Sequence, residues 1–145
     1  MKILFLDIDG VLNSVRSAIA LGGYPRPNRF KNKFDKVAVQ LIRILCVKTD
    51  TVICLSSTWR RYVNLETFSK QMKLPILYKT SVKLSSNRGE EIDMWLKDNK
   101  VDKYAIIDDD CDMLTEQLPY FVKVDGRNGL SYENYQDLLK LLEEK

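Results

Sequence analysis

This chain of 145 residues has no histidine, only three cysteines and no hydrophobic run long enough to cross a membrane. Without histidine, acid–base chemistry near neutral pH must fall to carboxylates. The cysteines have no paired spacing, so they predict neither a disulfide framework nor a zinc site and favour a reducing, cytoplasmic compartment. The first apolar run ends at Asp7 and is too short and too acidic for a signal peptide. We therefore expect no signal peptide and no membrane association.

The sequence also has no internal repeat, low-complexity segment or linker. Its 45% hydrophobic and 30% charged residues are typical of a single globular domain, which we assign to residues 1–145. Glycines and prolines gather between residues 22 and 27. Residues 13–34 are therefore predicted to form a flap, with a short helix at residues 15–21.

Positive charge is concentrated around this flap. Residues 13–36 contain six basic residues and one acidic residue, a charge of +5, so the rest of the chain carries −2 of the overall +3. A basic segment beside an acidic site favours a polyanionic substrate, although a plain solvated loop would look the same. The flap also contains three aromatic residues, Tyr24, Phe30 and Phe34. They could stack on nucleobases or simply pack the flap.

Short apolar runs alternate with helical patterns along the chain. Strands are predicted at residues 2–7, 51–55, 76–79, 103–107 and 120–124, and helices at 35–48, 58–70, from Asn87, at 112–117 and from Ser131. This alternation predicts an α/β fold, a Rossmann-like parallel sheet with helices on both faces. Only about two dozen residues separate Gly10 from the first long helix, which is too few for a full cap domain.

The most informative segment is Asp7-Ile8-Asp9-Gly10, which follows the first predicted strand. Carboxylates at i and i+2 project the same way from an extended chain and repel unless a cation or a proton lies between them. Alone, the segment would also fit a hairpin turn. However, two other strands end in Ser56-Ser57 and Asp108-Asp109, and the carboxyl ends of parallel strands meet at one edge. The sequence therefore predicts a site at that edge.

These segments resemble motifs of the haloacid dehalogenase-like (HAD) phosphohydrolases. Asp7 to Leu12 is similar to the first motif, Ser56 to the second, and Ile106 to Asp109 to the fourth in its paired-acid form. The third motif is a lone basic residue near a helix start. Arg88 is our candidate for it, and Lys83 is the runner-up.

The resemblance implies a set of roles. Asp7 is expected to be a nucleophile that forms an aspartyl-phosphate, and Asp9 to be the general acid and base. The expected phosphate-binding residues are Ser56, Ser57 and Arg88. The expected cofactor is Mg²⁺, with ligands from Asp7, from the pair Asp108 and Asp109 and, as in the family, from the backbone carbonyl of Asp9. Which of Asp108 and Asp109 binds the metal directly is left open.

Within the superfamily, three segments look like the small phosphatase domains associated with RNA repair: Ser56 to Arg60, Arg88 to Ile92 and Val124 to Leu130. The phosphatase domain of phage polynucleotide kinase is a more distant likeness. The resemblance implies an Mg²⁺-dependent phosphomonoesterase acting on DNA or RNA ends, or on nucleotides. A PIN-type metal-dependent nuclease and a catalytically silent binding module of the same fold remain alternatives. The sequence leaves open the oligomeric state and which phosphate end is used.

Some side chains near the motifs have two interpretations. Arg60 is expected to bind substrate, although it also fits an ordinary solvated helix charge. Trp59 fits the core better than a stacking platform. Asp110 and Asp112 fit caps for the helix that follows them better than metal ligands.

Overall fold

The computed structural model describes residues 1–83 and 86–143. Its five strands form one parallel sheet in the order β3-β2-β1-β4-β5. They are β1 (Lys2–Leu6), β2 (Thr51–Leu55), β3 (Ile76–Lys79), β4 (Lys103–Asp108) and β5 (Phe121–Lys123). Each strand predicted from an apolar run is present, because strands buried on both faces carry near-continuous hydrophobic sequence.

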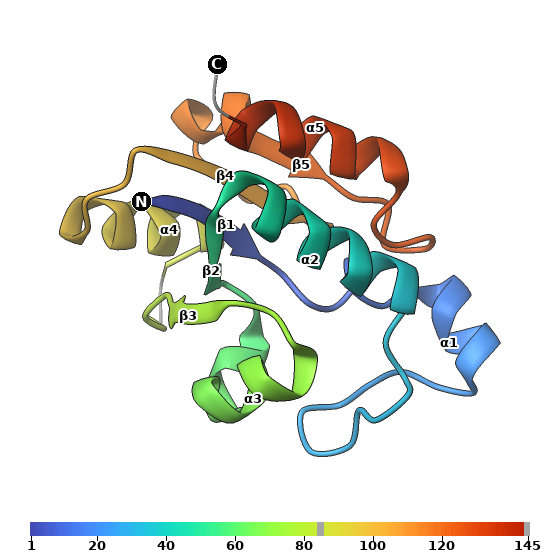
Figure 1. Cartoon of the computed structure of the whole chain (residues 1–145). Helices are drawn as coiled ribbons and strands as arrows, with labels where there is room; N and C mark the ends of the chain where they lie inside the picture. Colours follow the sequence, from blue (N-terminus) through green and yellow to red (C-terminus); the bar gives the residue numbers. More distant parts are fainter. Residues whose placement is uncertain (84–85, 144–145) are drawn as a thin grey trace.

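Helices cover both faces of the sheet (Figure 1). On one face, α2 (Lys36–Thr49) packs beside α5 (Tyr132–Leu142), and on the other lies α4 (Arg88–Asp98). Strand residues alternate between the two cores, so Leu4 and Leu6 belong to the larger core while Ile3 and Phe5 face α4. The predicted α/β fold is confirmed.

Side-chain caps begin the three long helices, two of them, at Asn87 and Ser131, as predicted. Asp35 accepts hydrogen bonds from the backbone N–H groups of Val37 and Ala38 at the start of α2. Asn87 and Ser131 cap α4 and α5 in the same way. These caps satisfy backbone donors that have no partner within the helix.

Two predicted helices differ from the structure. The helix expected at residues 58–70 is divided into a 3₁₀ turn, η1 (Thr58–Arg61), and α3 (Leu65–Met72). The division arises because Asn64 caps a new helix by accepting a hydrogen bond from the N–H of Thr67. The helix expected at 112–117 is η2 (Thr115–Tyr120), and Asp112 accepts a hydrogen bond from the N–H of Arg88 instead. Asp112 therefore caps α4, not the helix that follows it.

The flap connects β1 to α2. Its described structure is the predicted short helix, α1 (Val15–Leu21), followed by a loop that projects away from the sheet (Figure 1). Near the tip, Arg26 and Arg29 exchange two backbone hydrogen bonds of 3.1 and 2.8 Å across a two-residue turn. The chain between β1 and α2 is thus a small insertion.

Candidate active site

The register of the sheet places the predicted motifs next to one another at the carboxyl ends of β1, β2 and β4. Leu6 pairs with Leu55 on one side and with Ile107 on the other, so the next residues, Asp7, Ser56 and Asp108, emerge side by side. The pairing continues beyond the strands, since the N–H of Asp7 donates to the carbonyl of Ile107 at 3.1 Å. The convergence expected at the carboxyl edge is therefore present.

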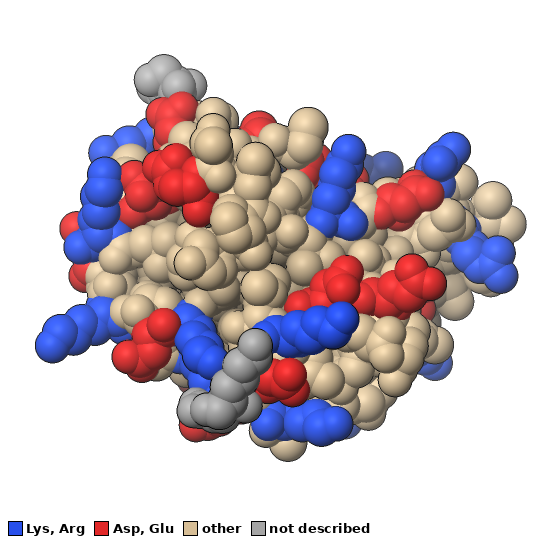
Figure 2. All heavy atoms as spheres, turned by 90° about the horizontal axis from the view of Figure 1, so that it is seen from above, with Lys and Arg blue, Asp and Glu red and all other residues tan. Residues whose placement is uncertain are grey.

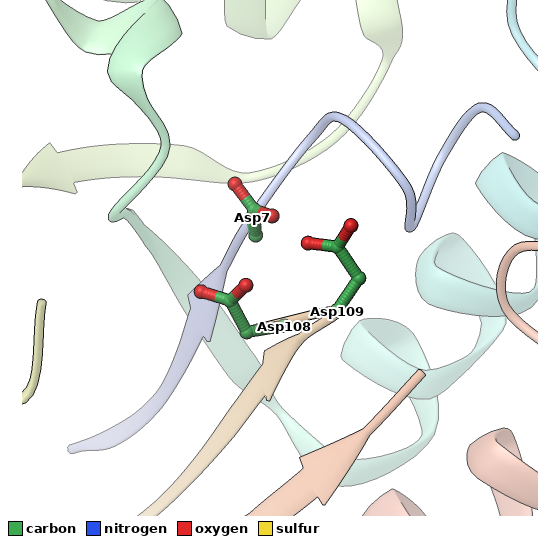
Figure 3. Close-up of side chains that lie close together, drawn as sticks. All are labelled: Asp7, Asp108 and Asp109. Carbon is green, nitrogen blue, oxygen red and sulfur yellow. The ribbon is translucent and has the colours of Figure 1, made fainter. Parts of the chain in front are cut away.

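Three carboxylates gather at this edge. Asp7, Asp108 and Asp109 each offer an oxygen, and these atoms lie within 4.8 Å of one another. Figure 3 shows the three side chains around the space between the ends of β1 and β4. Asp7 and Asp108 are buried, whereas Asp109 is more exposed. Carboxylates grouped in this way can hold a metal ion.

Arg88, at the start of α4, reaches the same cluster. Its Nη1 lies 3.1 Å from Oδ1 of Asp7 and 2.5 Å from Oδ2 of Asp108. Lys83 has its side chain exposed, and only its backbone N–H contacts the α4 region, through Glu91. Of the two candidates for the third motif, the structure brings Arg88 to the acidic residues.

The charges of this cluster are not balanced by the protein. Burial raises the pKa of Asp7 from 3.8 to about 9, and Asp108 adds to the rise while Arg88 opposes it. The pKa of Asp109 is also raised, mainly by burial. Burial lowers the pKa of Arg88, but the carboxylates of Asp7 and Asp108 outweigh that effect and raise it. Three carboxylates against one guanidinium leave a formal charge of −2 when all are ionised, so a divalent cation fits the cluster.

The buried hydroxyl of Ser56 is a second observation that indicates a ligand at this site. Its side chain is 1% exposed, and its hydroxyl has no hydrogen-bond partner among the described residues. A buried hydroxyl without a partner is costly, and an oxygen-rich ligand would satisfy it. Ser57 differs, because its hydroxyl accepts a hydrogen bond from the N–H of Trp59 and caps η1.

Asp9 lies beside the cluster, not within it. Its exposed carboxylate accepts a hydrogen bond from Nδ2 of Asn13 at 3.0 Å and from the indole Nε1 of Trp59 at 3.1 Å. Asn13 also accepts from the N–H of Gly10 at 3.1 Å, which ties the turn together. Trp59 is buried, as its predicted place in the core requires, and it also orients Asp9.

Arg60 forms its ion pair with Glu91, and among the described residues it forms none with the three aspartates. It is 4% exposed, and its N–H groups donate to the carbonyls of Ser56, Ser57 and Thr80 and to Oε2 of Glu91. These contacts favour a structural role over the substrate contact that we expected. Burial lowers the pKa of Arg60, and Glu91 counteracts that effect.

The aromatic residues of the flap divide into two groups. Phe30 and Phe34 pack against the rings of Trp59 and Phe68, with centroids 5.5 to 5.9 Å apart. These contacts favour the packing interpretation for both phenylalanines. Tyr24 is 49% exposed and lines a cavity next to Asp9. Of the three, Tyr24 is therefore the residue that faces the cavity beside Asp9.

Fold and site together define a HAD-type domain. The chain belongs to the family described as the HAD domain in Swiss Army Knife RNA repair proteins, whose sequence profile matches residues 3–135. This membership places it among the phosphatase-type hydrolases of the HAD superfamily. No curated protein and no solved structure matches the chain. None of the helices in residues 1–83 and 86–143 is long and apolar enough to span a membrane.

Sequence reasoning missed three residues that shape the site. Asn13 and the indole of Trp59 both hold Asp9, and Gly126 lies against the carboxylate of Asp109. Asn13 had a local signal, because it lies four residues after Asp9. The other two contact the site from distant parts of the chain, so no local pattern identifies them.

Proposed function

We propose that this domain is an Mg²⁺-dependent phosphomonoesterase that acts through an aspartyl-phosphate on Asp7. The observation that carries the proposal is the buried Asp7 between Arg88 and two further aspartates, with the unpartnered hydroxyl of Ser56 at the same level of the sheet. Family membership supports the same reaction class.

The first half-reaction transfers the phosphoryl group to the protein. An oxygen of Asp7 attacks phosphorus, the bond from phosphorus to the ester oxygen breaks, and Asp9 gives a proton to the departing alcohol. Ser56 donates to a non-bridging phosphate oxygen, and Arg88 offsets negative charge. One adjacent backbone N–H would be a second donor to the phosphate, as the resemblance to the HAD phosphohydrolases implies.

The second half-reaction releases phosphate. Asp9, now ionised, takes a proton from water as the water oxygen attacks phosphorus, and Asp7 leaves as a carboxylate. Asn13 and Trp59 keep the Asp9 carboxylate in place for both steps. Because the chain has no histidine, Asp9 has no imidazole rival for this role.

The metal ligands follow from which oxygens are engaged. Both oxygens of Asp108 have protein partners, Arg88 and the N–H of Asp110, whereas Asp109 is more exposed. Asp7 and Asp109 would therefore bind Mg²⁺ directly, together with the backbone carbonyl of Asp9, and Asp108 would hold Arg88. The bound ion supplies positive charge that allows an anionic phosphate to approach an anionic nucleophile.

The proposed substrates are nucleic-acid ends or nucleotides. The small flap leaves the carboxyl edge open to a phosphate on a large molecule, and most of the flap's basic residues are exposed. On the face that Figure 2 shows, basic and acidic side chains are interspersed, so neither sign of charge dominates that face. The RNA repair proteins named in the family description favour the same substrate class. Free cysteines, two of them buried, agree with the cytoplasmic location that we propose.

The test compares p-nitrophenyl phosphate with 3′-phosphorylated and 5′-phosphorylated oligonucleotides, each with and without Mg²⁺. We expect phosphate release that requires Mg²⁺ and disappears in Asp7→Asn, an isosteric variant whose folding is checked by circular dichroism. Internal strand cleavage without phosphate release would overturn the proposal in favour of a PIN-type nuclease. Binding without any turnover would overturn it in favour of a silent module.

A further inference from the structure

A cavity of about 410 Å³ opens beside Asp9 and is also lined by Asp109. Its wall includes Asp9, Asn13, Trp59, Tyr24, Arg26 and Gly126. Since Asp9 protonates the departing oxygen in the proposed reaction, this cavity lies where the leaving group must be held. Its size is in the range of ordinary ligand sites.

The flap wall of this cavity is firmly held. Phe30 and Phe34 anchor the flap on Trp59. Nζ of Lys33 donates to the carbonyls of Leu21 and Gly22 at 2.8 and 3.3 Å, so this lysine closes the loop and is not free to bind a substrate. A wall that is already ordered loses little entropy when it binds a ligand.

Two arginines are fixed side by side at the flap tip. Arg26 and Arg29 form a hydrogen-bonded antiparallel pair, and residues paired in this way point to the same face. No carboxylate among residues 1–83 and 86–143 forms an ion pair with either. Like charges opposite each other are destabilising, so this pair favours an anion as its partner.

We propose that this wall binds the nucleotide attached to the scissile phosphate, with Tyr24 stacking on its base and the Arg26–Arg29 pair holding the adjacent phosphodiester. This inference rests on the proposed function and narrows its substrate to a strand end with an unstacked terminal base. A mononucleotide offers the base but no phosphodiester, so it uses only part of the site. An aromatic face accepts any base, which predicts weak sequence preference.

The test measures kcat/KM for mononucleotides and trinucleotides that carry a 3′-phosphate or a 5′-phosphate, with p-nitrophenyl phosphate as the reference. At whichever end is used, we expect the trinucleotide to exceed its mononucleotide by about tenfold or more, the size of one stacking or charge contact. Tyr24→Ala should lower trinucleotide turnover by about tenfold, and Tyr24→Phe should restore it. Turnover of p-nitrophenyl phosphate should fall by less than turnover of the trinucleotide in Tyr24→Ala, because its leaving group enters the same cavity but carries no nucleobase.

The arginine pair is tested by Arg26→Gln with Arg29→Gln. The matched control is Lys48→Gln with Lys140→Gln, which removes the same charge from exposed positions on α2 and α5. Binding of a labelled 3′- or 5′-phosphorylated trinucleotide is measured in the Asp7→Asn background at several salt concentrations. Loss of one phosphate contact should reduce the slope of log affinity against log salt by about 0.7 in the arginine variant and not in the control.

The outcomes separate this inference from the proposed function. If the wild type hydrolyses p-nitrophenyl phosphate with Mg²⁺ but has the same kcat/KM for trinucleotide and mononucleotide, the inference is wrong and the proposed phosphatase activity still stands. If trinucleotide binding depends on Tyr24 and the arginine pair without any hydrolysis, the inference stands and the phosphatase proposal fails. If the slope of log affinity against log salt is the same in the arginine variant and the control variant, the proposed contact of the arginine pair with the phosphodiester is wrong.

Discussion

Asp109 is held between two glycines from distant parts of the chain. Gly10 has a φ of +84° and leaves no room for a side chain, because a Cβ there would overlap the Asp109 carboxylate. A Cβ on Gly126 would lie 2.8 Å from Oδ2 of Asp109. The two glycines therefore fix the direction of the carboxylate that we assign to the metal.

We expect Asp109→Ala to raise the Mg²⁺ concentration needed for half-maximal activity by more than Asp110→Ala does. Asp110 is exposed, and its side chain only accepts a hydrogen bond from the N–H of Cys111. Gly126→Ala should raise the Mg²⁺ concentration needed for half-maximal activity by about tenfold, which is less than the effect of Asp109→Ala and more than that of Asp110→Ala. A change of this size is typical when a group that orients a metal ligand is disturbed. Magnesium titrations of phosphate release measure all three. A larger effect of Asp110→Ala would mean that the acidic run is assigned in the wrong register.

Asp7 makes the stability of the metal-free protein depend on pH. Burial raises its pKa to about 9, so between pH 4 and 9 the folded state holds a proton that the unfolded state has lost. The contribution of Asp7 to the free energy of unfolding therefore falls as the pH rises from 4 to 9.

Asp7→Asn removes this titration. In EDTA, the Tm of Asp7→Asn minus that of wild type should increase from pH 5 to pH 8, and saturating Mg²⁺ should reduce the increase because the cation favours the ionised carboxylate. Thermal unfolding at several pH values measures the difference. A difference that stays constant with pH would show that Asp7 is ionised without metal.

The ends of β2 and β3 and the starts of η1 and α4 are joined by Arg60 and Glu91. Their Nη2 and Oε2 atoms lie 3.1 Å apart and both side chains are buried. Arg60 also donates to the carbonyls of Ser56 and Thr80, so it holds the loop that presents Ser56. The pair thus positions, through the backbone, the serine that we propose to bind phosphate.

We expect Arg60→Met to destabilise the protein by about 3–5 kcal/mol, because it removes the cation that pairs with the buried Glu91 carboxylate. Arg61→Met is the matched control, since Arg61 is its exposed neighbour, and should change stability by no more than about 0.5 kcal/mol. Replacing both members of the pair, in Arg60→Met with Glu91→Met, should recover much of the loss. Urea unfolding gives these values. If Arg60→Met leaves stability unchanged but raises KM, the result would instead support the substrate contact that we first expected for Arg60.

Local sequence patterns predicted most elements, because each strand is a short apolar run and Asn87 and Ser131 are helix caps. At residues 58–70 the local cap at Asn64 was overlooked. At residues 112–117 a tertiary contact decides, because Asp112 accepts a hydrogen bond from the start of α4. The acidic residues and Ser56 were predictable because strand ends converge in a parallel sheet. The contact of Gly126 with Asp109 joins segments far apart in sequence, so no local pattern reveals it.

The whole molecule concentrates its chemistry at one edge of the sheet. Motifs from β1, β2 and β4 meet there, α4 contributes Arg88, and the flap adds a basic wall beside Asp9. The insertion between β1 and α2 is small, so the edge stays accessible to a phosphate at the end of a long strand. In the proposed phosphatase reaction, the flap would set the specificity.

The central claim is a phosphoryl group carried by Asp7, and chemical trapping tests it most directly. Asp9→Asn is mixed with p-nitrophenyl phosphate and Mg²⁺, quenched during the first turnover, reduced with borohydride and examined by peptide mass spectrometry. An aspartyl-phosphate is reduced to homoserine, so the account predicts homoserine in place of Asp7, dependent on both substrate and Mg²⁺. A burst of p-nitrophenol with Asp7 unmodified in every peptide would contradict it.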